Sequence, residues 1–274
     1  MIKQFGIIGN PIKHSLSPIL HNYWLKKYNI DANYSIIDIK NEKDLPVIIK
    51  KIRNKDISGI NITLPYKQKI VSYVDALVND AETTSSVNTI YLDNKDTVVG
   101  ENTDVFGLQA AYLKEIDNAQ KKKVLVIGAG GVSPSVILSL QKSGVQEISI
   151  INRTIEKCIF LKKKFNKLKI IEWEKLQEEI KNFDVIINAT SLGLKGSKDF
   201  EFNFTQTKKD LIYIDTIYNP LETKTLKYLK KMDIKVFNGL NMFIYQGQKS
   251  FYLWNKINPE IDEKLIEILV SNLK

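Results

Sequence analysis

The stretch KKKVLVIGAGGVSPSVILSL, residues 121–140, decides the fold of the second half of the chain. It predicts a buried strand that runs into a turn made of Gly128, Ala129, Gly130 and Gly131, with a helix directly after the turn. A strand, a tight glycine turn and a helix in this order bring backbone N–H groups and the positive end of the helix up to a pyrophosphate. The stretch therefore predicts a Rossmann-type dinucleotide-binding unit.

The next predicted strand, EISIINRT, ends at Asn152 and Arg153, where the ribose of a dinucleotide is expected. An acidic residue at this point would bind the 2′-hydroxyl of NAD, and the sequence has none. Arg153, with Lys157 one helical turn further on, suits the 2′-phosphate of NADP instead. A surface arginine is the alternative interpretation, but the helix dipole disfavours a cation at a helix start. The pattern favours NADP.

Two further strands, in DVIINATSLG and DLIYIDTIYNPLET, end at the same predicted edge of the sheet. Ligands of open α/β sheets bind at the carboxyl ends of the strands. Ordinary loop chemistry also explains the polar residues there, but small residues at this edge would let a nicotinamide ribose approach the backbone. The candidates are Asn188, Ala189, Thr190, Thr216 and Tyr218.

Composition bounds the class of protein. A chain of 274 residues, with 43% hydrophobic and 26% charged residues, predicts a globular protein with two domains. The single cysteine, Cys158, forbids an internal disulfide and a cysteine metal cluster. The sequence shows neither a secretion signal nor about 18 consecutive apolar residues, so we expect a cytoplasmic protein without a membrane partner.

The net charge of +9 does not point to a nucleic-acid partner. The lysines are spread along the chain, and no arginine-rich arm or basic stripe with interleaved aromatics is present. We interpret the charge as favouring solubility and the approach of anionic small molecules. His14 and His21 have no partners at metal-ligand spacing, so no metal site is predicted.

The first half alternates strands and helices as well, which predicts a second α/β unit. Ser17 is expected to be the N-cap of a helix that has Pro18 in its first turn. The pattern predicts strands over 3–9, 33–39 and 57–63, helices over 17–30 and 42–54, short helices over 67–81, a hairpin around Asn94, a helix over 103–116 and two helices within 240–271.

The stretch NITLPYKQ, residues 61–68, places Lys67 directly after a strand rich in β-branched residues. A lysine beside a core strand loses water unless a neighbour compensates, so Lys67 is either a snorkelling surface residue or a functional one. Other polar residues also follow strand ends. Each alone suits a cap or a turn, but the set suits a site for a small polyhydroxylated acid: Ser15, Ser17, Thr63, Asn88, Asn102 and Asp104.

The chain resembles the shikimate dehydrogenases. The resemblance covers almost the whole chain, in the family's order and spacing, which makes it far more specific than a glycine fingerprint alone. The matching motifs are GNPIKHSLSPILHN, GINITLPYK, ETTSSVNTI, GENTD, GAGG, NRT, NATSLG, YNPLET and GLNMFIYQG.

The resemblance implies the NADP-dependent interconversion of 3-dehydroshikimate and shikimate, on the route to chorismate and the aromatic amino acids. It implies an α/β fold of two domains with a cleft between them. Residues 1–103 plus 240–274 would form the substrate-binding catalytic domain, and residues 104–239 the NADP-binding Rossmann domain. We expect a monomer or homodimer.

The family's functional residues map onto this sequence. Lys67 and Asp104 would form the catalytic pair, which makes Lys67 functional. The substrate would be bound by Ser15, Ser17, Thr63, Lys67, Asn88, Asp104, Tyr218 and Gln246. NADP would be bound by Gly128, Ala129, Gly130, Gly131, Asn152, Arg153, Thr154, Lys157, Asn188, Ala189, Thr190, Thr216, Gly239 and Met242.

Some positions depart from the family pattern, and three alternatives stay open. Val132, Ser133, Pro134 and Ser135 replace the usual small and basic residues after the glycine turn, and Tyr66 stands where histidine is frequent.

A quinate dehydrogenase of broader specificity would keep nearly every motif. A folate dehydrogenase would not need the serines of HSLSP. A non-catalytic NADP-sensing protein would not need a lysine–aspartate pair.

Overall fold

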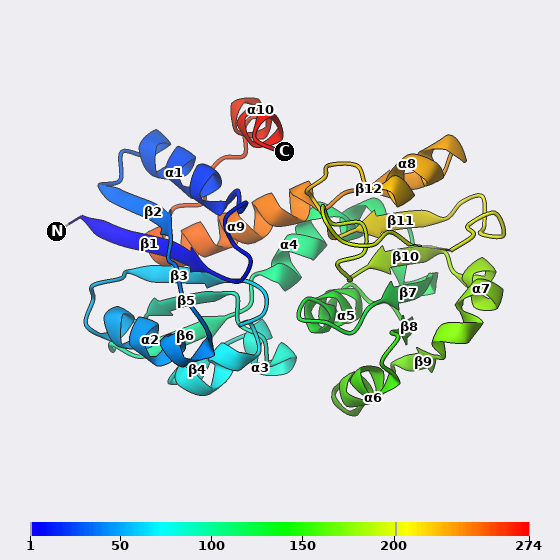
Figure 1. The fold of residues 1–274 in the computed structure, drawn as a ribbon, viewed down its shortest axis with the longest axis horizontal. Helices are drawn as coiled ribbons and strands as arrows, with labels where there is room; N and C mark the ends of the chain where they lie inside the picture. The colour runs from blue at the N-terminus through cyan, green and yellow to red at the C-terminus, as the bar shows by residue number, and fades with distance from the viewer. Residues whose placement is uncertain (1, 201, 274) are drawn as a thin grey trace. The chain divides into compact units, whose positions relative to one another are not determined.

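The computed structural model describes residues 2–200 and 202–273, which form two compact units. The first unit contains the chain up to Val105 together with Ile244–Asn272, and the second contains Phe106–Phe243 and Leu273. Each unit holds a six-stranded sheet covered by helices (Figure 1). Within the described residues, no helix is long and apolar enough to span a membrane.

The sheet of the first unit is mixed. β1 pairs in parallel with β2 and β3, whereas β5 is antiparallel to both β3 and β6. The β5–β6 pair is the hairpin predicted around Asn94. In spatial order the strands are β2 (Ala32–Ile36), β1 (Lys3–Ile8), β3 (Gly59–Ile62), β5 (Thr89–Leu92), β6 (Val98–Glu101) and β4 (Ala76–Leu77).

Helices cover both faces of this sheet. On one face the isoleucines of α2, such as Ile52, pack with Ile60 and Ile62 in a common core cluster. On the other face Trp254 of α9 lies so close to Gly59 that a Cβ there would meet the indole Nε1 at 2.3 Å, so only glycine fits. The helices are α1 (Ser17–Lys27), α2 (Leu45–Arg53), α3 (Asp80–Thr84), α9 (Leu240–Asn255), which begins in the second unit, and α10 (Glu263–Ser271).

The sheet of the second unit is entirely parallel, as the alternation of strands and helices predicts. Its two edge strands, β9 and β12, were not predicted, because three residues are too few to show a period. In spatial order the strands are β12 (Lys235–Phe237), β11 (Ile212–Asp215), β10 (Val185–Asn188), β7 (Lys123–Ile127), β8 (Glu147–Ile151) and β9 (Lys169–Ile171).

Helices cover this second sheet as well. Leu125 and Tyr213 share a core cluster with Leu176 of α7 and Leu229 of α8. Since side chains alternate across a strand, the neighbouring positions face the opposite side, where α5 contacts β7 and α6 contacts β8 and β9. The helices are α4 (Asp104–Ala111), which begins in the first unit, α5 (Ser133–Lys142), α6 (Ile155–Lys164), α7 (Leu176–Glu179) and α8 (Lys224–Lys231).

The predicted α/β class with two domains is confirmed, but some details were wrong. Leu16, not Ser17, is the N-cap of α1, because the Leu16 carbonyl accepts the first helical hydrogen bond, from the Leu20 N–H. The segment expected to form short helices over 67–81 contains a 3₁₀ turn, Lys69–Tyr73, and the strand β4. Short 3₁₀ turns and two-residue strands lack a recognisable hydrophobic period.

Candidate active site

Lys67 and Asp104 form an ion pair in the first unit. Lys67 Nζ donates to Asp104 Oδ2 at 2.6 Å, and their side chains are only 13% and 6% exposed. The Lys67 carbonyl accepts from the Val87 N–H, which fixes the lysine backbone beside the start of β5. A buried ammonium needs such a partner, because it has left most of its water behind. Lys67 is therefore no snorkelling surface lysine.

Asn88 and Gln246 join this pair. The Asn88 Nδ2 donates to Asp104 Oδ1 at 2.9 Å and contacts Gln246 Oε1 at 3.3 Å. Asn88 precedes β5 and Gln246 lies on α9, so side chains that are far apart in the sequence meet at one point. The arrangement presents an ammonium, a carboxylate and two amides, groups that are chemically able to bind and protonate oxygen functions of a polar ligand.

The segment that carries Asp104 is held along its length. The Asn102 Oδ1 accepts from the Asp104 N–H at 3.1 Å, and its Nδ2 donates to Thr84. Glu101 accepts from the Asn102 N–H and from Asn79, and its burial raises the pKa of its carboxyl group. These side chains fix the backbone at the start of α4 and so the direction of Asp104.

The serines predicted to bind the substrate, Ser15 and Ser17, lie at the start of α1. The Ser15 Oγ accepts from the Ser17 N–H at 3.2 Å, one residue before the N-cap position at Leu16. Thr63 follows β3, and its methyl group lies against Gly9, where a Cβ would approach it to 2.4 Å. All predicted substrate residues except Tyr218 belong to the first unit.

The glycine turn of the second unit has the predicted geometry. Gly128 has a φ of +109°, and a Cβ there would lie 2.9 Å from the Ala189 carbonyl oxygen, so only glycine fits. The Gly128 N–H donates to the Ile151 carbonyl, which ties the turn to the end of β8. The turn therefore joins the ends of β7, β8 and β10 at the edge of the sheet where the cofactor is expected.

Two side chains hold this turn, and sequence reasoning missed one of them. The Ser133 Oγ accepts from the Gly130 N–H and donates to the Gly128 carbonyl, both at 2.9 Å. The Asn152 Oδ1 accepts from the Ala129 N–H at 3.2 Å. A hydroxyl two residues after a glycine run was a usable signal, but Ser133 was noted only as a departure from the family pattern. With the Gly128 N–H, at least three N–H groups of the turn thus donate within the protein.

Arg153 and Lys157 are exposed at the start of α6. In residues 2–200 and 202–273, no carboxylate forms an ion pair with either cation. Thr154 is the N-cap of α6, and its side chain makes no capping hydrogen bond. Two available cations beside an uncapped helix N-terminus suit an anion such as a phosphate monoester.

The ends of β10 and β11 are joined by buried hydrogen bonds. Asn188 accepts from the Thr190 N–H and hydroxyl, and it donates to Asp215 Oδ1 at 3.0 Å. The Thr216 hydroxyl donates to the Asn188 carbonyl. Asp215, which was not predicted, is fully buried, and desolvation raises the pKa of its carboxyl group to about 6. These contacts order the loop that carries Asn188, Ala189 and Thr190.

Gly239 and Met242 precede and open α9 on the side of the second unit. A Cβ on Gly239 would lie 2.3 Å from the Thr216 carbonyl oxygen, so the backbone approaches too closely for any other residue. The Met242 N–H donates to the Tyr112 hydroxyl. The Tyr218 ring stacks on Phe243 at a centroid distance of 4.6 Å. These residues therefore continue the β11 edge of the second unit.

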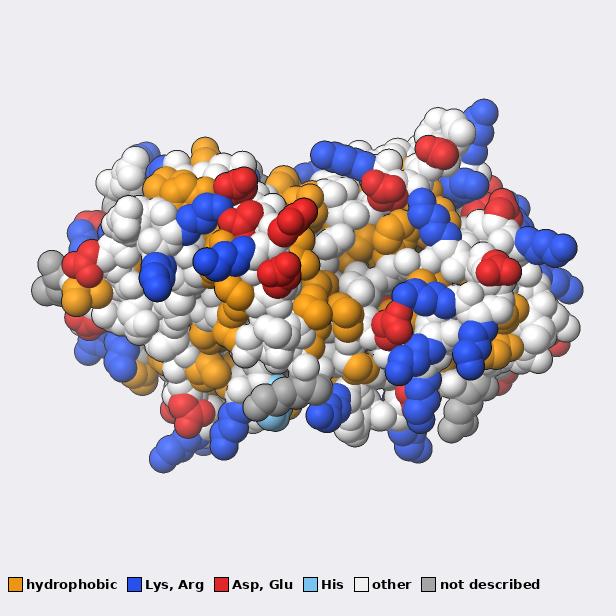
Figure 2. Space-filling view, turned by 90° about the horizontal axis from the view of Figure 1, so that it is seen from above, with side chains coloured by type: hydrophobic (Ala, Val, Ile, Leu, Met, Phe, Trp, Pro, Cys, Tyr) orange, Lys and Arg blue, Asp and Glu red, His pale blue; other side chains and the backbone are white. Residues whose placement is uncertain are grey.

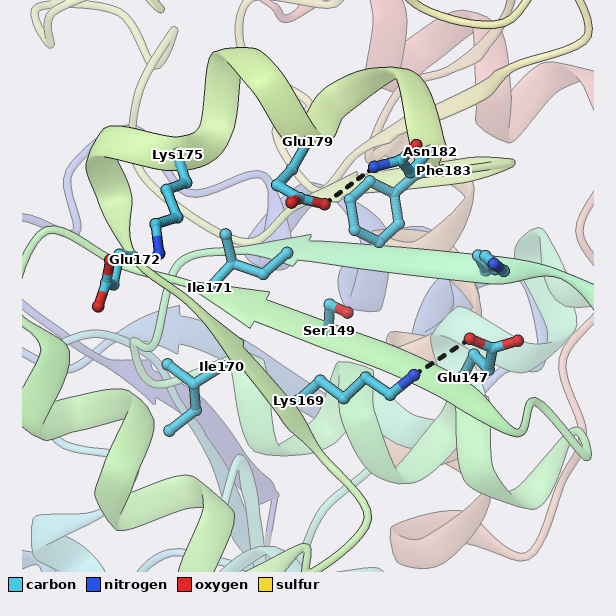
Figure 3. Close-up of a pocket in the computed structure, with 11 residues that line it drawn as sticks. Glu147, Ser149, Lys169, Ile170, Ile171, Glu172, Lys175, Glu179, Asn182 and Phe183 are labelled. Atoms are coloured by element: carbon cyan, nitrogen blue, oxygen red, sulfur yellow. Dashed lines mark hydrogen bonds and ion pairs between the residues drawn. The ribbon is translucent and has the colours of Figure 1, made fainter.

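A separate pocket of about 630 Å³ in the second unit holds none of the predicted residues (Figure 3). Lys123, Glu147 and Lys169, which begin β7, β8 and β9, line it together with the segment of α7. Four of its charged side chains form ion pairs, Lys169 with Glu147 at 3.2 Å and Lys175 with Glu172 at 3.0 Å. Because none of the residues predicted to bind substrate or cofactor lines this pocket, we assign the chemistry to the residues above.

Two further observations concern the charges on the surface and the residues that could bind a metal ion. Basic and acidic side chains are interspersed on the face seen in Figure 2. In the part of the chain that the structure describes, no three His, Cys, Asp or Glu side chains group as metal ligands.

The chain matches known proteins over nearly its full length. Residues 7–90 match the family model "Shikimate dehydrogenase substrate binding domain", and residues 111–234 match "Shikimate / quinate 5-dehydrogenase". The shikimate dehydrogenase (NADP(+)) of Pelagibacter ubique is 47% identical over 272 residues, which cover 98% of this chain and 99% of that protein.

Solved structures agree with this match. Shikimate dehydrogenase from Aquifex aeolicus is 35% identical with a TM-score of 0.88, over 98% of this chain and 97% of that one. The enzyme from Thermus thermophilus, in complex with NADP(H) and shikimate, is 28% identical with a TM-score of 0.87, over 99% of this chain and 100% of that one. The chain belongs to the shikimate dehydrogenase family.

Proposed function

We propose that this chain catalyses the reversible NADPH-dependent reduction of 3-dehydroshikimate to shikimate, in the route to chorismate and the aromatic amino acids. The observation that carries the proposal is the buried pair of Lys67 and Asp104, with Asn88 and Gln246 in contact. Membership of the family supplies the reaction, and the pair supplies the groups that the reaction needs.

Lys67 is the proposed proton donor. Bound NADPH supplies a hydride to the carbonyl carbon of the substrate. Negative charge then develops on the carbonyl oxygen, and the Lys67 ammonium stabilises and protonates that oxygen. Asp104 holds the ammonium in place through an ion pair at 2.6 Å. In shikimate oxidation the same groups act in reverse, and Lys67 receives the proton.

The remaining polar residues of the first unit are the proposed substrate site. Ser15 and Ser17 present hydroxyls from the start of α1 for the carboxylate. Thr63, Asn88, Asp104 and Gln246 provide the donors and acceptors for the ring hydroxyls, and Tyr218 is assigned to the carboxylate end. A set of hydroxyls and amides with one carboxylate suits a polyhydroxylated acid better than it suits an apolar ligand.

The second unit is the proposed NADP site. The glycine turn offers close backbone approach for the pyrophosphate, since Gly128 has no room for a side chain. Arg153, Lys157 and the N-terminus of α6 at Thr154 suit the 2′-phosphate, because they are exposed and unpaired among the described residues. The residues present therefore fit NADP. The Asn188–Thr190 loop, Thr216, Gly239 and Met242 are assigned to the nicotinamide side.

The proposal extends to the roles of the two units. Residues 1–103 with 240–274 would bind the substrate, and residues 104–239 would bind NADP. The description of the family model that matches residues 7–90 supports the first assignment. A cytoplasmic monomer or homodimer completes the proposal, and sedimentation velocity would test the oligomeric state.

The decisive experiment mixes the purified protein with NADP and shikimate and follows reduced nicotinamide by absorbance, with NAD and quinate in parallel. We expect rapid reduction of NADP by shikimate alone. Comparable rates with quinate would move the chain to a broader quinate/shikimate specificity, which the description of the second family model also names. No reduction in any combination would favour a non-catalytic NADP-sensing protein.

A further inference from the structure

Three buried hydroxyls form a connected group beside Asn88. They belong to Thr89 at the start of β5, Thr103 after β6, and Ser250 on α9, and we call them the hydroxyl cluster. Each of the three residues is at most 1% exposed, and Asn88 is 2% exposed. The proposed chemistry does not use these hydroxyls directly. Buried polar groups of this kind are costly unless they satisfy one another, so their arrangement has a structural cause.

A backbone donor fixes which way the Asn88 amide points. The Thr103 N–H lies 2.8 Å from Asn88 Oδ1. A backbone N–H only donates, so the atom that faces it must be the amide oxygen. The amide nitrogen consequently faces Asp104 Oδ1 at 2.9 Å, and Asp104 Oδ2 is left for Lys67.

The hydroxyl cluster contacts both ends of this amide. The Thr89 hydroxyl lies 3.0 Å from Asn88 Oδ1, and the Thr103 hydroxyl lies 3.1 Å from that oxygen and 2.9 Å from Asn88 Nδ2. The Ser250 Oγ donates to the Gln246 carbonyl one turn earlier on α9, at 3.0 Å. Because its single proton is used there, Ser250 Oγ serves as an acceptor for its other neighbours.

Ser250 thereby links α9 to several strand ends. Its Oγ lies 2.8 Å from the Thr89 hydroxyl, 3.2 Å from the Thr103 hydroxyl and 3.0 Å from Asn61 Nδ2. Ser250 and Thr103 are 147 positions apart in the sequence. The same helix carries Gln246, so the cluster also fixes Gln246 against Asn88.

We propose that Thr103 and Ser250 are positioning residues for the Lys67–Asp104 pair. They act through Asn88, whose amide nitrogen anchors one oxygen of Asp104 while the other oxygen meets Lys67. The Thr103 hydroxyl contacts the Asn88 amide directly, and Ser250 holds the hydroxyls of Thr89 and Thr103 that lie against it. This inference rests on the proposed function for its kinetic consequence. The arrangement of hydrogen bonds that it describes belongs to the protein without ligands.

Two substitutions remove the hydroxyls with little change in volume. Thr103→Val keeps the backbone N–H that bonds Asn88, and Ser250→Ala removes one oxygen. We expect each to lower kcat for shikimate oxidation about tenfold, the effect of one buried hydrogen bond of ordinary strength. Thr103→Ser restores the hydroxyl and should recover most of the rate.

A double-mutant cycle separates positioning from a general loss of structure. In a Lys67→Ala background there is no ammonium to position, so Ser250→Ala should change the residual kcat less than twofold. Ser139→Ala is the matched control, because Ser139 is also a fully buried helix serine, and its hydroxyl donates only to the Val136 carbonyl in the second unit. That variant should keep the parental kcat.

The outcomes distinguish this inference from the proposed function. An active parent with unchanged kcat in both Thr103→Val and Ser250→Ala overturns the inference alone, as does an equal loss in the Lys67→Ala background. If the parent oxidises neither shikimate nor quinate, NMR exchange of the Asn88 side-chain amide decides. Faster exchange in both variants supports the positioning role, and unchanged exchange overturns it whatever the substrate is.

Discussion

Lys67 Nζ lies 2.6 Å from Asp104 Oδ2, although the two residues are 37 positions apart in the chain. Asp104 in turn takes its direction from Asn88 on its other oxygen and from Asn102 on its backbone N–H. The Lys67 ammonium has three N–H donors, and its hydrogen bond to one carboxylate oxygen leaves it able to donate to a bound ligand as well.

Replacement of Lys67 by alanine should lower kcat by about 10²- to 10⁴-fold, the usual contribution of a positioned acid or base. The dissociation constant for NADP should stay within about twofold, since Lys67 belongs to the first unit. Steady-state assays and fluorescence titration measure the two quantities. Lys69→Ala is the control, because Lys69 is exposed and pairs with Glu42 instead. Unchanged turnover in Lys67→Ala would remove the catalytic assignment.

Replacement of Arg153 by alanine should weaken NADP binding about 10- to 100-fold, as expected for the loss of hydrogen bonds to a charged phosphate. NAD binding should change little, because NAD lacks the 2′-phosphate. Isothermal titration with both cofactors measures the difference. Lys162→Ala, an exposed cation in the last turn of the same helix, should leave both affinities intact. Equal weakening of NADP and NAD would contradict the 2′-phosphate assignment.

Replacement of Gly128 by alanine should damage the glycine turn more than its backbone strain alone explains. Gly128 and Gly196 both have a positive φ, but only at Gly128 would a Cβ meet backbone, at 2.9 Å from the Ala189 oxygen. We expect Gly196→Ala to cost roughly 1–2 kcal/mol of unfolding free energy, and Gly128→Ala to cost more and to weaken NADP binding. Denaturant unfolding and titration test this. Equal effects would show that the close approach is unimportant.

His21 should make the protein less stable in mild acid. Burial lowers the pKa of His21 to about 3, against an opposing contribution from Asn61, and the ring stacks on Tyr34. The unfolded chain therefore binds a proton below about pH 6.5 that the folded chain does not bind, so stability falls as the pH falls. The loss between pH 7 and pH 5 should be about 2 kcal/mol. His21→Phe should abolish that part of the pH dependence, and an identical slope would contradict it.

Asp215 should act in the opposite direction. Its folded pKa of about 6 lies above the ordinary value of 3.8 for an aspartate, so the folded state binds the extra proton, and stability falls as the pH rises from 4 to 6. The change should be roughly 2 kcal/mol between pH 4 and pH 7. Asp215→Asn should remove it, as measured by urea unfolding across this range. A variant whose stability keeps the wild-type pH dependence would show that Asp215 ionises normally.

The sequence by itself determined the parts of this protein that depend on neighbouring residues. The glycine turn at Gly128 and the cations after β8 lie within single βα units, where spacing along the chain translates directly into geometry. The alternation of strands and helices likewise sufficed for the α/β class. The motifs around Lys67 and Asp104 pointed to their pairing only through the family resemblance.

Only the tertiary structure decided the contacts between distant segments. Several local patterns of the sequence are compatible with more than one structure, so only the tertiary structure identified three features. These are the N-cap at Leu16, the edge strands β9 and β12, and the hydrogen bonds of Ser133 to the glycine turn. The meeting of Ser250 with Thr103 has no local signal at all. The packing of the helices on the sheet determines which polar side chains are buried together. The chemistry of a hydroxyl is the same at every position, so the sequence does not show which groups it will bond.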